Sequence, residues 1–181
     1  YYVYILYVYV IICYKRITME SLHPNDCLYY LVTRVSLSLT SLLKKRLVES
    51  GCDFVKPAYI GVLLWLWMDD GMGTMLGKFG KDEGIKLNDL GKLAGLEPSS
   101  MTGLIDRMEK DGLVVRANDP KDRRVTNIQL TQKGINVRKH IIEIMDTVTK
   151  EIFATIPKKQ EDIAMDVLKK ILISASNLEK F

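Results

Sequence analysis

The sequence predicts a mainly α-helical fold with a small β-hairpin wing, which is an α+β class. Residues 98–110 carry apolar side chains at helical spacing, and a glycine-type helix stop follows them. Residues 113–116 and 125–130 then show β-branched alternation around the turn-forming run 118–120. This succession is typical of a winged helix-turn-helix, and long apolar helices on both sides predict an added helical layer.

The first 14 residues, YYVYILYVYVIICY, carry no charge. They are fewer than the roughly 20 apolar residues that a membrane span needs, and neither a basic region nor a small-residue cleavage site marks a signal peptide. We expect residues 1–18 to be a non-native or disordered leader, with Met19 as the natural start. An interfacial anchor and an aggregation-prone edge strand are the alternatives.

Two helices and a loop are expected before the helix-turn-helix. Residues 26–50 repeat leucine and valine at helical spacing, and residues 58–68 are apolar on almost every side, which predicts a helix buried on almost every side. Residues 69–84 hold five glycines and are expected to form a loop. Residues 87–95 then form the first helix of the motif, with Asn88 as its N-cap.

The helix expected at 98–110 has two unlike faces. Met101, Leu104, Ile105 and Met108 recur at i, i+3, i+4 and i+7, and form a stripe that should face the core. The opposite face is small or polar, and short hydroxyl groups near a helix N-terminus suit close approach to phosphates and base edges. We expect this face to enter a DNA major groove. Its candidate contacts are Ser99, Ser100, Thr102, Gly103, Arg107 and Lys110.

The tip of the hairpin is rich in cations. Lys121, Arg123 and Arg124 surround a single acid, Asp122. Arginine favours a narrow minor groove because the negative potential is enhanced there, so the wing should meet a second stretch of duplex. Asp122 lies two residues before Arg124, and we expect its carboxylate to hold the Arg124 guanidinium in a fixed orientation.

The remaining chain is expected to be helical. Thr131 is predicted to cap a helix that runs past Phe153, Pro157 ends it, and a last helix covers residues 158–178. These helices carry more apolar surface than one small winged helix can cover, which predicts a homodimer. The alternative is an intramolecular hairpin formed by the last two helices.

The composition is that of a globular protein, and the histidines and cysteines give no sign of an enzyme or a metal site. The 181 residues are 48% hydrophobic and 27% charged, as in a globular protein, and a net charge of +4 with a pI near 8.9 argues only weakly for an acidic partner. His23 and His140 belong to no ligand or nucleophile motif, so no enzyme, metal site or cofactor is expected. Cys13, Cys27 and Cys52 lack CxxC spacing, which suggests reduced thiols in a cytoplasm, and no membrane partner is expected.

Three runs, residues 106–116, 119–124 and 130–134, together resemble the signature of the MarR family of bacterial transcriptional regulators. The last run reads LTQKG. Sequence motifs are shared over about residues 87–134, and the order of expected elements is similar over about residues 20–181. A helix, a wing and LTxKG in combination are far less expected by chance than any one short motif.

The resemblance implies a single domain over residues 19–181. Dimerisation helices would cover about 26–50 and 131–181, and the winged helix-turn-helix about 57–130. The expected function is sequence-specific binding of double-stranded DNA by a homodimeric repressor, on a pseudo-palindromic operator whose half-sites lie about one helical turn, roughly 34 Å, apart. Lys110 and Arg116 would position phosphates.

The resemblance also implies regulation by a small aromatic effector. Tyr59, Trp65 and Trp67 could line its cleft, although aromatic side chains on a buried helix are more often core residues. Cys27 is placed similarly to the reactive thiol of peroxide-sensing members, which leaves a redox regulator as an alternative, against ordinary packing of that side chain. A protein-interaction module that binds no DNA is a further alternative.

Overall fold

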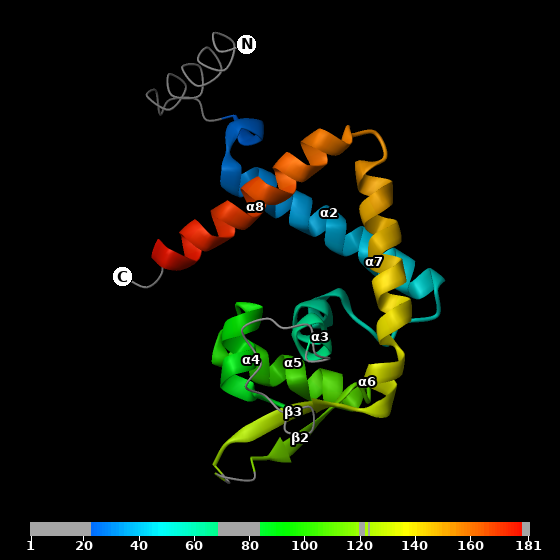
Figure 1. The fold of residues 1–181 in the computed structure, drawn as a ribbon, viewed down its shortest axis with the longest axis vertical. Coiled ribbons are helices and arrows are strands. Elements are labelled where there is room, and N and C mark those ends of the chain that lie inside the picture. The colour runs from blue at the N-terminus through cyan, green and yellow to red at the C-terminus, as the bar shows by residue number, and fades with distance from the viewer. Residues whose placement is uncertain (1–22, 69–83, 120–121, 123, 179–181) are drawn as a thin grey trace. The chain divides into compact units, whose positions relative to one another are not determined.

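The computed structural model describes residues 23–68, 84–119, 122 and 124–178 (Figure 1). The chain divides into two compact units, residues 1–41 and 42–181. The expected leader, most of the glycine-rich loop, and the wing residues Lys121 and Arg123 lie outside the described residues. Within the described segments, no helix is both long and apolar enough to cross a bilayer.

The described part of the first unit is helical. A short 3-10 helix, η1 (Pro24–Asp26), precedes α2 (Leu28–Glu49), so the expected helix begins at Leu28 and not at residue 26. The Asp26 N–H donates to the His23 carbonyl at 2.8 Å, which closes a tighter turn there. Cys27 lies half-buried between the two helices, and its carbonyl accepts the first α-helical bond, from Leu31 at 3.0 Å.

The second unit has a hydrophobic core built from helices and a small sheet. A 3-10 turn, η2 (Pro57–Tyr59), leads into α3 (Ile60–Trp67), and α4 (Leu87–Ala94) and α5 (Pro98–Lys110) follow. The expectation of a helix buried on almost every side is wrong for α3, because Leu64 is exposed and Trp65 is half-buried. The fully buried core includes Val62, Leu63, Leu90, Ile105, Met108, Leu113, Ile128 and Ile141.

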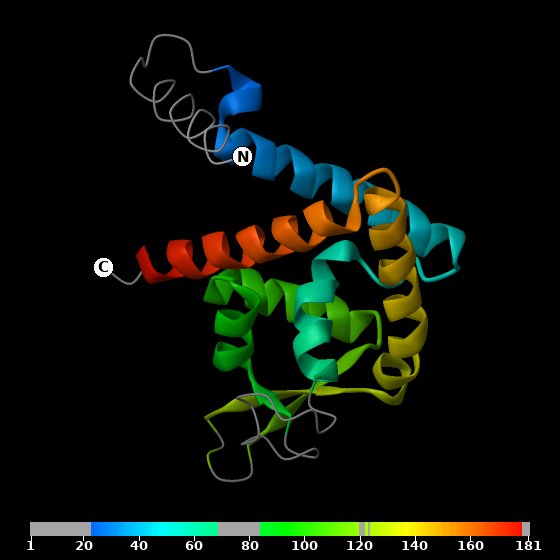
Figure 2. The same cartoon turned by 45° about the horizontal axis from the view of Figure 1, so that its top comes forward.

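Three antiparallel strands form the sheet, in the order β1-β3-β2. The expected hairpin is confirmed as β2 (Val114–Asn118) and β3 (Thr126–Leu130), and it extends beyond the helices of this unit (Figure 2). The sequence analysis missed β1 (Ile85–Lys86), in which Ile85 pairs with Ile128 of β3.

The short strand β1 also decides where α4 begins. Because β1 ends at Lys86 and α4 starts at the next residue, Lys86 occupies the N-cap position and Asn88 lies inside the helix. The prediction that Asn88 caps this helix is therefore wrong. The Lys86 side chain forms no capping hydrogen bond with the first turn of α4.

After the sheet come α6 (Gln132–Asn136), α7 (Arg138–Phe153) and α8 (Lys158–Leu178). The structure confirms the predicted last helix, α8, and the predicted break before it at Pro157. The single helix expected from Thr131 past Phe153 is instead interrupted at Val137 and ends at Phe153.

The LTQKG run joins the sheet to these helices. Thr131 is confirmed as the N-cap, because its hydroxyl oxygen accepts from the Gly134 N–H at 3.0 Å and donates to the Gly112 carbonyl at 2.6 Å. The Trp67 indole donates to the Gly134 carbonyl at 2.9 Å. Lys133 donates to the Asp111 carbonyl at 2.8 Å. The run thus ties α6 to α3 and to the end of α5.

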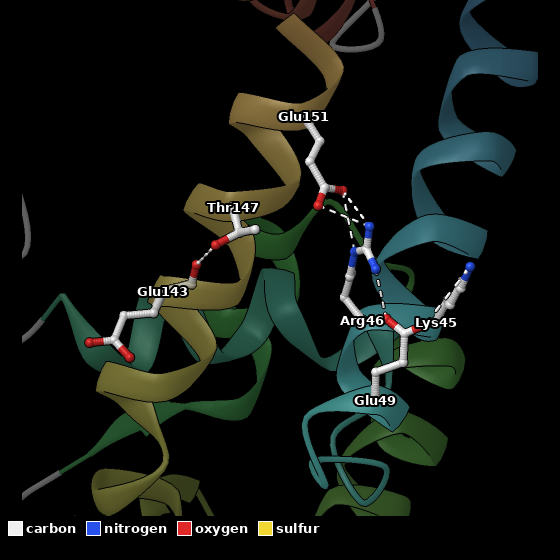
Figure 3. A network of polar contacts seen from close by, with 6 residues as sticks. All are labelled: Lys45, Arg46, Glu49, Glu143, Thr147 and Glu151. Atoms are coloured by element: carbon white, nitrogen blue, oxygen red, sulfur yellow. Dashed lines mark hydrogen bonds and ion pairs between the residues drawn. The ribbon is translucent and has the colours of Figure 1, made fainter. Parts of the chain in front are cut away.

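The end of α2 is held to α7 by ion pairs on the surface of the second unit (Figure 3). The Arg46 guanidinium donates to both carboxylate oxygens of Glu151 at 2.9 Å and to Glu49 at 2.7 Å. Hydrogen bonds to Glu49 and then to Glu151 raise the pKa of Arg46. Bidentate geometry fixes the angle between two helices better than a single contact would.

Replacing Gly134 with alanine is expected to lower the free energy of unfolding by more than about 1 kcal/mol, because an added Cβ would overlap the Leu113 carbonyl oxygen and crowd Leu130. Gly61→Ala is the matched control, since a Cβ on that helical glycine meets nothing within 4 Å and alanine is the better helix former. Thermal unfolding followed by circular dichroism should give a lower midpoint for the first variant only. Equal midpoints would contradict this packing.

Candidate nucleic-acid interface

The helix α5 presents one face to the core and the other to solvent. Met101, Leu104, Ile105 and Met108 are all buried, which confirms the predicted stripe. Pro98 begins the helix at a position where a missing N–H costs nothing. Burial of this apolar stripe therefore determines which side chains of α5 face solvent.

The solvent face of α5 carries the small polar side chains near its N-terminus. Ser99, Ser100 and Thr102 are exposed, and Gly103 is half-buried. The Thr102 hydroxyl donates to the Pro98 carbonyl at 2.9 Å, which leaves its oxygen lone pairs facing outward as acceptors. The Glu97 side chain does not cap the helix, so first-turn N–H groups remain open to an anion.

Gly112 ends this helix and directs the chain into β2. Its φ of +75° lies in the left-handed region that favours glycine. The Leu113 N–H then donates back to the Met108 carbonyl at 2.9 Å, in the pattern of a glycine-terminated helix. The wing strand consequently starts one residue after the turn and runs back beside α5.

Arg116 joins the wing to α5. Its guanidinium donates to Asp106 at 2.6 Å and to Glu109 at 2.5 Å, and its main-chain N–H donates to Glu109 at 3.2 Å. Burial would lower the pKa of Arg116, but the hydrogen bonds to Asp106 and Glu109 outweigh it and the pKa is raised. A planar guanidinium between two carboxylates fixes direction as well as distance.

This arrangement changes the role expected for Arg116. The sequence analysis assigned its charge to a phosphate, whereas two carboxylates of α5 already neutralise it. We therefore assign Arg116 to positioning: it holds β2 against α5. The partners lie ten and seven residues earlier in the chain, a separation at which no helical or strand periodicity would have indicated the pairs.

Two aspartates shape the wing. Asp119 accepts the Asp122 N–H at 3.1 Å and the Asn127 side-chain amide at 3.2 Å. The carboxylate of Asp122 accepts the Arg124 N–H at 2.9 Å. The sequence analysis expected Asp122 to contact the guanidinium of Arg124. The structure shows instead a contact to the main chain of Arg124. These contacts fix the backbone of the loop, and the Arg124 side chain is exposed.

Asp119 was not among the candidate site residues. The Asn118-Asp119-Pro120 run had been interpreted only as a turn, although an aspartate at such a place commonly accepts N–H groups a few residues on. Of the other predicted cations, Arg107 and Lys110 are exposed near the C-terminal end of α5.

The aromatic residues proposed for an effector cleft lie mostly in the core. Tyr59 is 2% exposed and its hydroxyl donates to Asp111 at 2.7 Å. Burial and then this hydrogen bond raise the pKa of Tyr59 to about 12. Trp67 is 3% exposed and is bonded to the LTQKG run, so both are structural. Trp65 packs against the core but stays half-buried.

Groups capable of metal or thiol chemistry do not gather at this interface. Among the described residues, no cluster of histidine, cysteine, aspartate or glutamate is arranged to hold a metal ion. Cys52 is buried, and burial raises the pKa of its thiol, which keeps it protonated.

Residues 80–126 match the model of the MarR family. A curated relative, the HTH-type transcriptional regulator MhqR of Bacillus subtilis (strain 168), is 28% identical over 89 residues, which are 49% of this chain and 61% of the relative. The chain thus aligns with about three fifths of that relative's length.

Solved structures extend the likeness to most of the chain. CouR from Rhodococcus jostii RHA1, bound to p-coumaroyl-CoA, is 28% identical with a TM-score of 0.63, over 83% of this chain and 95% of that chain. A transcriptional repressor, CouR, bound to a 23-mer DNA duplex, is 20% identical with a TM-score of 0.67, over 84% and 99%. At 20% identity, the comparison with the DNA-bound repressor shows a similar fold and no more.

Replacing Arg116 with glutamine is expected to lower the free energy of unfolding by about 1–2 kcal/mol, because two charge-assisted bonds between α5 and β2 are removed. Arg107→Gln is the control, since the structure shows no ion pair for Arg107 with any residue it describes. Urea unfolding should show that Arg116→Gln and Glu109→Gln together lower the free energy of unfolding by less than the sum of their separate effects, because each removes the same ion pair. Additive effects, or equal losses of stability for Arg116 and Arg107, would show that this junction holds nothing together.

Proposed function

The chain belongs to the MarR family of winged helix-turn-helix transcriptional regulators, and from this premise we propose that it binds double-stranded DNA as a homodimer and represses transcription. The named relatives are transcriptional regulators and not enzymes.

The observation that carries this proposal is the junction made by Arg116. It holds the exposed face of α5 and the β2–β3 wing as one body with two outward surfaces. An α-helix fits the major groove, and a basic loop beside it reaches the adjoining minor groove. A fixed angle between them lets both surfaces meet one duplex without further ordering on binding.

The exposed residues divide into base-reading and backbone-positioning groups. In this proposal Ser99, Ser100, Thr102 and Gly103 approach the major groove, where short side chains and a glycine allow the helix to come close. Arg107 joins them at the other end of α5, and Lys110 positions a phosphate. Arg124, on a loop shaped by Asp122, enters the minor groove, aided by Lys121 and Arg123.

A second copy of the chain is the proposed cover for the apolar side chains of α2 and α8. Leu168 and Leu172 of α8 are 51% and 68% exposed, and Leu28 and Val35 of α2 are 59% and 55% exposed. Apolar side chains exposed to this extent along a helix mark an interface. A two-fold dimer would read half-sites about one helical turn apart.

The double change Leu168→Glu and Leu172→Glu is expected to give a monomer, because two charges would be buried in the proposed interface. Light scattering should then give the mass of one chain, against two for the wild type. Glu substitutions at Lys159 and Lys169, which are exposed on the same helix, are the control and should keep the dimer. A monomeric wild type would instead favour the intramolecular hairpin.

Release by a small aromatic effector completes the proposal. It is supported by CouR, whose solved structure holds p-coumaroyl-CoA. An effector shifts DNA affinity only if it binds one arrangement of the two reading units better than another. Of the three aromatic candidates, Trp65 keeps part of its side chain at the surface and is the one we retain for this contact.

Arg124→Ala is expected to weaken operator binding by roughly tenfold, because it removes a cation from the enhanced negative potential of a narrow minor groove, and a specific arginine contact to DNA is worth about 1–3 kcal/mol. Lys139→Ala is the matched control, since that exposed lysine lies on α7, away from α5 and the wing in the chain. Fluorescence anisotropy with a labelled operator measures both. Equal effects of the two changes would argue against minor-groove reading by the wing.

A further inference from the structure

A cleft of about 380 Å³ lies between the first helix of the helix-turn-helix and the base of the wing. One wall is formed by the end of β1 and the start of α4, and the other by the residues that lead into and begin β3. The polar side chains that line it are Lys86, Asn88, Asp89, Lys92, Arg124 and Thr126. None of these except Arg124 was singled out for binding by the sequence.

The charge of this cleft is unbalanced. Lys86, Lys92 and Arg124 contribute three cations, and Asp89 is the one acid in its lining. Among the residues that the structure describes, none of these three cations forms an ion pair, in contrast with Arg116 on the opposite edge of the hairpin. Cations gathered in a concave site, and left without carboxylate partners, favour a bound anion.

Neutral donors add to the cations. The amide of Asn88 and the hydroxyl of Thr126 lie in the same lining. Leu87, Asn88 and Asp89, in the first turn of α4, belong to the lining, and the Lys86 side chain does not cap this turn, so its N–H groups can face an anion. A tetrahedral anion with several oxygens suits two lysine ammonium groups and neighbouring neutral donors together.

We propose that this cleft binds a phosphate group of the DNA backbone, next to the groove that the wing enters. The inference rests on the proposed function. Arg124 lines the cleft and also belongs to the wing, so a phosphate held by Lys86 and Lys92 lies within one side chain's reach of the minor-groove contact. The wing thereby gains an anchor at its base in addition to its tip.

The salt dependence of DNA binding tests the cleft directly. In the Lys86→Ala and Lys92→Ala double variant, the slope of log affinity against log salt should become shallower by about 0.9 for each phosphate that the protein no longer neutralises, while the preference for operator over scrambled duplex stays unchanged. The control is Lys139→Ala with Lys150→Ala, two exposed lysines of α7. Asp89→Asn, which removes the one acid in the lining, should strengthen binding about two- to tenfold.

Methylphosphonate substitution identifies the phosphate. Each backbone position of the operator is neutralised in turn, and at one position per half-site the wild type should bind more weakly while the double variant is not weakened further. If the wild type binds operator and the double variant keeps the wild-type slope, the cleft proposal is overturned and the proposed function stands. If the wild type binds no duplex, both fail.

A free anion is the competing source of phosphate. Inorganic phosphate, added at constant ionic strength, should leave the thermal midpoint of the wild type unchanged at low millimolar concentration, because a single phosphate lacks the neighbouring contacts of a duplex. A midpoint that rises for the wild type but not for the double variant, together with no response to methylphosphonates, would assign the cleft to a free phosphate ligand and overturn the assignment to DNA.

Discussion

The ion pairs of Arg116 with Asp106 and Glu109 are the constraint on which the proposed DNA-binding surface, the exposed face of α5 together with the wing, depends. A helix and a hairpin are separately weak readers of DNA, since each would have to be ordered on binding. Arginine suits the junction because its five N–H donors lie in one plane and can satisfy two carboxylates at once. The acids that neutralise Arg116 belong to α5. The charge of Arg116 and the angle between α5 and β2 are therefore fixed within the protein, before DNA binds.

The winged unit is in turn held to the helices that follow it. Trp67 and Lys133 bond to main-chain carbonyls at Gly134 and Asp111, and Gly134 leaves no room for a side chain against Leu113. These contacts join α6 both to α3 and to the end of α5.

The sequence predicted what local patterns determine. The stripe on α5, its glycine stop and the hairpin all depend on side chains within a few positions of one another. The strand β1 was missed because two residues carry no periodicity, and with it the true start of α4 beside Asn88. The role of Arg116 depends on Asp106 and Glu109, which lie on the other side of the helix-to-strand turn, where neither helical nor strand periodicity applies. The Tyr59 hydroxyl bonds to Asp111, 52 residues away, which no local pattern indicates.

We propose that a pair of chains reads a major groove with α5 and the adjoining minor groove with the wing. Selection of bound sites from a random duplex library tests this most directly. We expect an enriched sequence with two-fold symmetry, half-sites about one helical turn apart, and an A·T preference on the outer flank of each half-site, where the minor groove is narrow. Enrichment of a single unsymmetric site, or of no sequence at all, would contradict it.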